Sequence, residues 1–192
     1  MNPVRQFFSK RHGTERGYAR HCLALLEYYT GSIDAFNHVE WSRVERIVFV
    51  CLGNICRSAY AHHYLLAKNP HIAVTSVGLS TTTGVGANAL AISTACHRGI
   101  DLASHLTTNF EDFEVNDGDL FLTMEIRQAK RIRDQLTGAC GVQIGLLGTL
   151  CDPPRPHLHD PFSLSAEYFQ TCFSHIETAV TALEKKLTSA ND

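Results

Sequence analysis

Residues 50–58, Val-Cys-Leu-Gly-Asn-Ile-Cys-Arg-Ser, combine the residue types that chemistry at phosphorus requires. An apolar run ends at Cys51, a loop containing Gly53 and Asn54 follows, and a helical pattern begins near Arg57. Backbone N–H groups converge in such a loop and at the start of such a helix, and the helix dipole adds partial positive charge. The stretch therefore predicts a phosphate-binding loop that follows a strand.

Cys51 and Arg57 are the residues expected to act on the bound phosphate. The N–H groups that bind an anion also stabilise a thiolate, so Cys51 at the floor of the loop is a candidate nucleophile. The planar guanidinium of Arg57 matches two oxygens of a phosphate. The hydroxyl of Ser58 would hydrogen-bond the thiolate or brace the loop. The phosphate itself is expected to lie against Leu52, Gly53, Asn54, Ile55 and Cys56.

Two Asp-Pro pairs are candidates for the acid that protonates a leaving oxygen. They are Asp152-Pro153 and Asp160-Pro161, and either pair would also suit an ordinary turn. Asp160 stands in a loop that leads into the last helical pattern, beside Phe162, whose ring would stack on an aromatic substrate. We therefore expect Asp160, rather than Asp152, to be the general acid.

Alternating strand and helix patterns are expected to position these residues. Buried strands are predicted at Arg46–Cys51, Ile72–Val77, Asp119–Thr123 and Val142–Leu147. Helices are predicted at Cys56–Lys68, Asn88–Arg98, Glu125–Leu136 and Ser163–Leu187. This order predicts an α/β fold, a three-layer sandwich whose central four-stranded parallel sheet is flanked by helices. Sites in such folds lie at the carboxyl ends of the strands.

The first 44 residues differ in composition and predict a helical extension, which leaves residues 45–192 as the main domain. Thr14 is a candidate N-cap, and Gly31 is expected to end the helix. A second short turn is expected at Ser32–His38. Residues expected on one apolar face of this helix are Tyr18, Cys22, Leu23, Leu25, Leu26 and Tyr29. The face would cover the chain's own domain, a second copy or another protein, and the first is favoured.

Composition excludes several classes of function. The chain has 192 residues and a net charge of −2, which disfavours non-specific binding to nucleic acid or to an anionic membrane surface. No apolar run approaches the length of a membrane span. Seven cysteines in a chain of this size do not suggest a disulfide framework, so a reducing cytoplasm is expected. The oligomeric state stays open.

Eleven histidines raise the question of a metal site. His62 and His63 are adjacent, and His157 and His159 are two residues apart, but neither pair has the spacing of a known zinc motif. We therefore expect neither a metal nor an organic cofactor.

The chain resembles the low-molecular-weight protein tyrosine phosphatase family over roughly residues 45–187. The family's loop, Cys-Leu-Gly-Asn-Ile-Cys-Arg-Ser, is present unbroken at residues 51–58. The resemblance implies that Ser76 braces the loop and that His105 is a partner of Asn54. It also implies that Asp160-Pro161-Phe162 is the acid loop, whereas Asp152 belongs to an earlier, non-catalytic Asp-Pro.

The resemblance implies a two-step hydrolysis of phosphotyrosine without a cofactor. Cys51 attacks phosphorus, Arg57 and the loop amides hold the equatorial oxygens, and Asp160 protonates the tyrosyl oxygen. Water activated by Asp160 then hydrolyses the cysteinyl-phosphate. The substrate would be a phosphotyrosine-containing protein, with a tyrosine kinase as one candidate.

Three departures from the family pattern bear on the substrate cleft and on the helix that follows the loop. Ala59 stands where Pro usually opens the helix, and Ser163 stands where a second aromatic residue is common. Residues 79–84 lack the aromatic residue with which many members form one wall of the cleft. Phe162 is therefore expected to be the main aromatic wall.

Two other functions and one regulatory device remain to be weighed. A thiol-relay arsenate reductase needs further cysteines after the third strand, and residues 124–138 contain none. A phosphate- or phosphotyrosine-binding module without turnover would not need both Cys51 and Asp160. Oxidation that joins Cys51 to Cys56 would silence an enzyme reversibly, and this hypothesis has equal weight with a merely structural Cys56.

Overall fold

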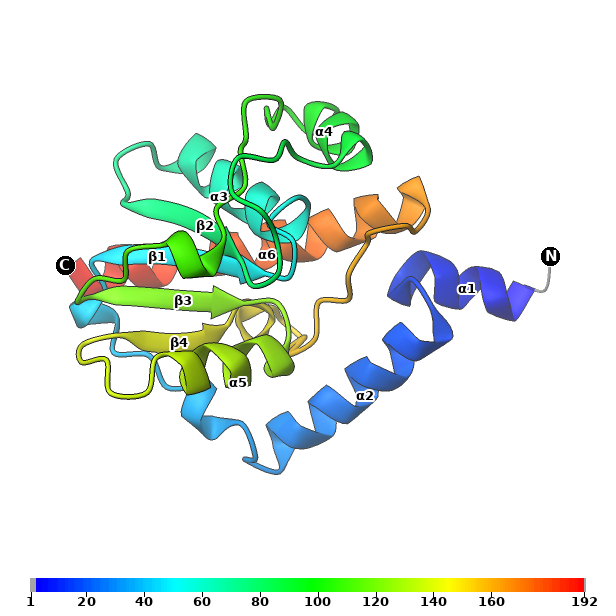
Figure 1. Ribbon diagram of the computed structural model, residues 1–192. Coiled ribbons are helices and arrows are strands. Elements are labelled where there is room, and N and C mark those ends of the chain that lie inside the picture. The colour runs from blue at the N-terminus through cyan, green and yellow to red at the C-terminus, as the bar shows by residue number, and fades with distance from the viewer. Residues whose placement is uncertain (1–2, 192) are drawn as a thin grey trace.

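The structure, a computed structural model, describes residues 3–191 and the side chains of residues 8–190. Its centre is a parallel sheet with the strand order β2-β1-β3-β4 (Figure 1). The strands are β1 (Arg46–Cys51), β2 (Val74–Gly78), β3 (Asp119–Thr123) and β4 (Gln143–Leu146). The predicted four-stranded parallel sheet is confirmed, and β1 and β3 have the predicted bounds. β2 begins two residues later than expected and extends to Gly78.

Four helices of the main domain also match the prediction closely. They are α3 (Arg57–Lys68), α4 (Ala89–Cys96), α5 (Ile126–Gln135) and α6 (Ala166–Asn191). The last helix begins three residues later than expected, because Ser163 has a left-handed φ of 63° that a helix cannot contain. Two short 3-10 helices, η3 (Phe110–Asp112) and η4 (Leu147–Leu150), lie in the connections.

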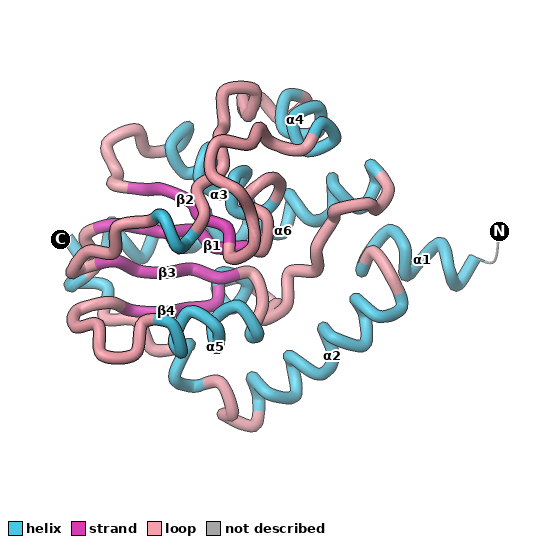
Figure 2. Tube along the Cα trace, in the orientation of Figure 1, coloured by secondary structure: helices cyan, strands magenta, loops and turns pink. Residues whose placement is uncertain are grey.

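The two faces of β1 pack against different helices (Figure 2). Ile47 and Phe49 belong to a core formed with α3, α4 and α6. Val48 and Val50 point to the opposite face, where they share a core with Ile132 of α5. Because both faces are buried, the strand is a continuous apolar run, as expected of a central parallel strand. The three-layer α/β sandwich is confirmed.

The N-terminal extension contains α1 (Pro3–His12), α2 (Glu15–Tyr29), η1 (Asp34–Phe36) and η2 (Trp41–Arg43). In Figure 1, α1 and α2 lie beyond the ends to which the strand arrows point. The predicted cap is present, since the Thr14 hydroxyl accepts a hydrogen bond from the Gly17 N–H at 2.9 Å. Sequence reasoning did not find α1, which lacks a clear apolar stripe. Ile33 and Phe36 are buried against β4 and α5.

The prediction of which face of α2 is buried is wrong. Leu23, Leu26 and Tyr29 are exposed, with 61%, 61% and 71% of their surface accessible. The buried residues are instead Gly17 and Ala24, because α2 approaches the domain through small side chains. Among the described residues, no helix combines the length and apolarity needed to cross a bilayer.

Candidate active site

The candidate site lies in the loop that joins the carboxyl end of β1 to the first turn of α3. Cys51 is buried at the end of β1, and its Sγ lies 3.0 Å from the Ser58 Oγ. The backbone N–H of Asn54 donates to the same sulfur at 3.2 Å. These two contacts hold Cys51 at the floor of the loop, and the Asn54 N–H is a donor that would favour a negatively charged sulfur.

Asn54 is the centre of the hydrogen bonds that shape this loop. Its φ of 54° lies in the left-handed region, which asparagine tolerates better than most residues. Its side-chain amide donates to Ser58 Oγ and to Ser76 Oγ, both at 2.9 Å. Its amide oxygen accepts the Thr108 N–H at 2.9 Å, and its backbone carbonyl bonds His105 Nε2 at 2.8 Å. The structure thus places Ser76 and His105 against Asn54.

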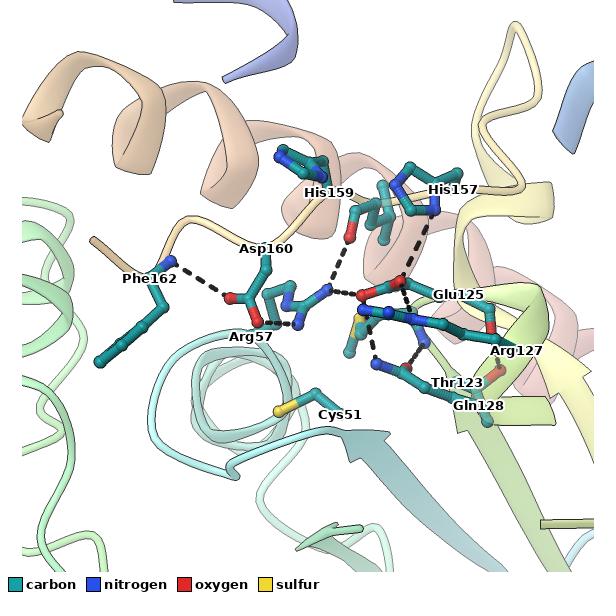
Figure 3. Close-up of polar contacts among 12 residues, drawn as sticks. Cys51, Arg57, Thr123, Glu125, Arg127, Gln128, His157, His159, Asp160 and Phe162 are labelled. Carbon is teal, nitrogen blue, oxygen red and sulfur yellow. Dashed lines mark hydrogen bonds and ion pairs between the residues drawn. The ribbon is translucent and has the colours of Figure 1, made fainter. Parts of the chain in front are cut away.

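Arg57 is 1% exposed and lies between two carboxylates (Figure 3). Its Nη1 donates to Glu125 Oε1 at 2.7 Å and to the Leu158 carbonyl at 2.8 Å. Its Nη2 lies 2.6 Å from Asp160 Oδ2. Burial opposes the charge, but Asp160 and Glu125 raise the pKa of Arg57 above its ordinary value. Nε of Arg57 is buried without a hydrogen-bond partner among the described residues.

Glu125 is a buried partner of Arg57 that the sequence analysis did not assign to the site. It follows β3 and is 1% exposed. Burial disfavours its charge, but the charge and hydrogen bond of Arg57, together with His157 and Arg127, lower the pKa of Glu125 to about 2. Its position at the carboxyl end of a central strand was the one signal available in the sequence.

The two candidate acids are separated by the fold. Asp160 lies over Arg57, and its Oδ1 accepts the backbone N–H of Phe162 at 3.2 Å. Asp152 instead lines a surface groove with Glu177 and Lys185, away from Cys51. Only Asp160 of the two shares a pocket with Cys51.

The pocket above Cys51 encloses about 170 Å³. It is lined by Cys51, Leu52, Gly53, Ile55, Cys56, Arg57, Ser80, Asp160 and Phe162. Apolar side chains form its walls, and Phe162 is 53% exposed at its mouth. Ser80, which the sequence analysis did not select, is brought in because its N–H donates to the Leu52 carbonyl at 2.8 Å.

Comparison with known proteins identifies the family. The family model described as low molecular weight phosphotyrosine protein phosphatase matches residues 46–191. The chain belongs to this family. The segment before residue 46 lies outside the match.

Relatives of this phosphatase family cover most of the main domain. The low molecular weight protein-tyrosine-phosphatase Wzb of Escherichia coli strain K12 is 32% identical over 133 residues, which are 68% of this chain and 87% of Wzb. The probable low molecular weight protein-tyrosine-phosphatase EpsP of Ralstonia nicotianae is 28% identical over 139 residues, or 72% of this chain and 93% of EpsP.

Solved structures agree with this fold. The tyrosine phosphatase Wzb from Escherichia coli K30, in complex with sulphate, superposes with a TM-score of 0.65 at 27% identity, covering 75% of this chain and 99% of Wzb. The YwlE arginine phosphatase from Geobacillus stearothermophilus gives a TM-score of 0.67 at 26% identity, covering 76% of this chain and 94% of YwlE.

The second cysteine of the phosphatase loop is less suited to be a nucleophile. Cys56 is 2% exposed at the start of α3. Burial raises the pKa of its thiol well above the ordinary value, and the neighbouring Cys51 adds to this effect. All seven cysteines are free. Oxidative pairing of Cys51 with Cys56 therefore stays a prediction.

Proposed function

We propose that this protein hydrolyses phosphotyrosine through a cysteinyl-phosphate, with Cys51 as nucleophile, Arg57 as phosphate clamp and Asp160 as general acid and base. The observation that carries the proposal is the convergence of these three groups on one pocket. The sulfur lies at its floor, the guanidinium at its side and the carboxylate at its mouth.

In the first step the Cys51 thiolate attacks phosphorus, and an S–P bond forms as the bond to the tyrosyl oxygen breaks. The loop N–H groups and Arg57 hold the three equatorial oxygens while charge redistributes. Asp160 in its acid form gives its proton to the departing tyrosyl oxygen. In the second step Asp160 takes a proton from a water molecule whose oxygen attacks phosphorus. A P–O bond forms as the S–P bond breaks, which releases phosphate and restores the Cys51 thiolate.

The ion pair between Arg57 and Asp160 implies an exchange of partners when substrate binds. In the free protein, Asp160 Oδ2 accepts from Arg57 Nη2 at 2.6 Å. A phosphoryl dianion would take this donor together with the unpartnered Nε, which lies on the same guanidinium. Asp160 would then be released toward the leaving oxygen, so phosphate binding and acid placement are linked.

The pocket walls favour an aromatic phosphoester. Leu52, Ile55 and Phe162 offer apolar surface above the loop. A phosphorylated guanidinium, the substrate that the name of YwlE indicates, would gain most from several acceptors around it. Asp160 is the one carboxylate among the residues that line this pocket. We therefore place phosphotyrosine before phosphoarginine.

The other parts of the assignment follow from this function. We assign residues 1–44 to a helical extension and residues 45–192 to the phosphatase domain. The substrate would be a phosphotyrosine-containing protein, a tyrosine kinase among the candidates, in the cytoplasm, where the free thiols stay reduced. A relay of the arsenate reductase type is disfavoured because residues 124–138 contain no cysteine.

Turnover of four substrates by three variants tests the proposal. The substrates are peptides carrying phosphotyrosine, phosphoserine or phosphoarginine, and p-nitrophenyl phosphate. We expect Cys51→Ser to lower kcat by at least ~10⁴-fold with every substrate that the parent hydrolyses. Asp160→Asn should lose more activity with phosphotyrosine than with p-nitrophenyl phosphate, whose leaving group needs less protonation.

Asp152→Asn is the matched control and should retain the parent activity, because Asp152 faces a different groove. Activity in Cys51→Ser close to that of the parent would refute the nucleophile. Equal losses in Asp152→Asn and Asp160→Asn would refute the acid. Faster hydrolysis of the phosphoarginine peptide than of the phosphotyrosine peptide would assign this protein phosphoarginine as its substrate, as the name of YwlE indicates for that protein.

A further inference from the structure

Three histidines gather beside the phosphate loop but outside the pocket. His62 and His63 come from the middle of α3, and His105 comes from the segment that precedes η3. One ring nitrogen from each lies within 4.8 Å of those of the other two. Among the described residues, this is the group of His, Cys, Asp and Glu side chains that has the geometry to hold a metal ion. We propose that the three imidazoles form a binding site for a divalent transition metal, zinc in particular.

Two of the rings already have the outer hydrogen bonds that metal-binding histidines need. A ligating histidine normally engages its other ring nitrogen with a carbonyl, carboxylate or similar group, which fixes the tautomer. His105 uses Nε2 for the Asn54 carbonyl at 2.8 Å, so its Nδ1 keeps a lone pair. His62 Nδ1 lies 3.3 Å from Ser76 Oγ, and in the tautomer whose Nδ1–H donates to this hydroxyl, Nε2 keeps a lone pair for a ligand.

His63 completes the site from between the other two rings. Its ring centroid lies 5.0 Å from that of His62 and 5.4 Å from that of His105. Burial lowers the pKa of His62 to about 4 and also lowers the pKa values of His63 and His105. Burial thus favours the neutral imidazole, which is the form that binds a metal.

The donor set selects the class of metal. Imidazole nitrogens suit zinc, copper and nickel, whereas calcium and magnesium prefer oxygen. In a tetrahedral zinc site with bonds of about 2.0–2.1 Å, ligand nitrogens are about 3.4 Å apart. The distances between the ring nitrogens, which are at most 4.8 Å, must therefore shorten by up to about 1.4 Å. Three protein ligands leave a fourth position for water or for another small ligand.

The site is connected to the phosphate loop without being part of it. None of the three histidines lines the pocket above Cys51. The groups behind the rings are the Asn54 carbonyl and Ser76 Oγ, and Ser76 also accepts from the Asn54 side chain. A bound metal would hold both imidazoles in the tautomers that support Asn54. We therefore expect zinc to stabilise the folded protein rather than to enter the reaction.

Zinc titration by isothermal calorimetry tests the site, and the background variant is Cys51→Ser. The substitution removes the thiolate that would compete for zinc, and it makes the binding result independent of the proposed catalytic function. We expect one zinc ion per chain. His63→Phe keeps an aromatic ring of similar size but no ligand, and it should weaken binding at least tenfold. His71→Phe, which replaces an exposed histidine outside the cluster, should bind zinc as the background does.

Cobalt(II) gives a second readout, because a tetrahedral nitrogen site absorbs visible light strongly and a hexaaqua ion does not. We expect this absorption in Cys51→Ser and its loss in a further His63→Phe or His63→Gln substitution. Circular dichroism of each variant verifies that it is folded, and the Gln variant serves if the Phe variant is not. The absence of stoichiometric zinc binding in Cys51→Ser, or equal binding by the folded His63 variants, would overturn the proposal.

Discussion

The phosphate loop, residues 51–58, and the acid loop meet at Arg57 but are held in different ways. The acid loop is taken from here on to include the segment that leads to Asp160, as residues 155–162. The phosphate loop makes many of its own hydrogen bonds, from Asn54 to Cys51 and to Ser58. Its other partners lie on and just after β2, at Asn88 and in the segment around His105, and Arg57 adds contacts to Glu125, Leu158 and Asp160. The contacts that fix the Cys51 sulfur, from Asn54 and Ser58, therefore come from within this one motif.

The acid loop depends on other segments, of which those containing Met124 and Thr14 are far away in the sequence. The N–H of Leu158 donates to the Met124 carbonyl at 2.9 Å, and the His159 carbonyl accepts from Tyr168 Oη at 3.3 Å. The N-terminal extension also reaches it, since Thr14 Oγ1 lies 3.3 Å from His159 Nε2. A nucleophile fixed by a local motif is thus served by an acid that distant elements position. Each of the two loops should respond to a different set of substitutions.

The largest effect on stability is expected at Glu125, which joins the two loops through Arg57. Glu125→Gln leaves the buried guanidinium with one carboxylate, so the free energy of unfolding should fall by about 3 kcal/mol at pH 7. Denaturant unfolding of the parent and the variant measures this difference. Glu111→Gln, at an exposed carboxylate, is the control and should change stability by less than about 0.5 kcal/mol.

The difference in unfolding free energy between the parent and Glu125→Gln should depend on pH. Because Arg57 lowers the pKa of Glu125 to about 2, this carboxylate stabilises the fold fully above its unfolded pKa of about 4.5. The contribution is lost as the pH falls from 4.5 toward 2. The difference in stability between parent and Glu125→Gln should therefore shrink over this range. A difference that stays constant from pH 6 to pH 2 would contradict the assigned ion pair.

The phosphate loop should be most sensitive at Asn54. Asn54→Ala removes the side-chain bonds to Ser58, Ser76 and Thr108. It also places alanine at a φ of 54°, so we expect kcat/KM to fall by ~10²-fold for phosphotyrosine and p-nitrophenyl phosphate alike. Steady-state kinetics with both substrates checks this.

Asn54→Ala should lower kcat/KM equally for the two substrates, because the phosphate loop acts on phosphorus whatever the leaving group is. Asn69→Ala, at the C-terminal end of α3, is the matched control and should remain close to the parent. A loss confined to phosphotyrosine would show that Asn54 acts through the acid loop, and the distinction between the two loops would fail.

The acid loop should respond to Gly17, which lies in the extension. A Cβ at this position would meet the His12 carbonyl and lie 2.7 Å from the His159 ring, so α2 or His159 has to move. Gly17→Ala should lower stability by about 1–3 kcal/mol. It should reduce kcat several-fold for phosphotyrosine and less for p-nitrophenyl phosphate, because the acid next to His159 is displaced.

Gly86→Ala is the control for this substitution, since a Cβ there meets no atom within 4 Å. Inhibition by vanadate measures the phosphate loop separately and should be unchanged in Gly17→Ala. If both substrates lose equally, or if vanadate binding weakens, the extension does not act through the acid loop.

The difference between the loops also explains which parts of the site the sequence could predict. Residues 51–58 are contiguous, and β1 has the predicted bounds. One continuous segment of sequence was therefore enough to predict both the loop and the strand that precedes it. Glu125 is distant from Arg57 in the sequence, and nothing local marks their contact. The buried side of α2 was missed because Gly17 and Ala24 make the contacts, whereas hydrophobic patterning favours large side chains.

The smallest effect is expected at Phe162, where the acid loop borders the substrate. Its ring is 53% exposed at the mouth of the pocket and makes no hydrogen bond through its side chain. Stacking on a tyrosyl ring would contribute about 0.5–1.5 kcal/mol, so Phe162→Ala should raise KM for phosphotyrosine peptides about two- to twelvefold while kcat changes little. Phe162→Leu should fall between the parent and Phe162→Ala.

The measurement is a comparison of KM for a phosphotyrosine peptide with KM for an alkyl phosphate that has no ring to stack. We expect Phe162→Ala to affect only the aromatic substrate, because the phosphate contacts of Arg57 and Cys51 do not involve the ring. A large fall in kcat would instead mean that Phe162 positions Asp160, whose Oδ1 accepts the Phe162 backbone N–H at 3.2 Å. In that case the residue would belong to the machinery of the acid loop rather than to the wall of the pocket.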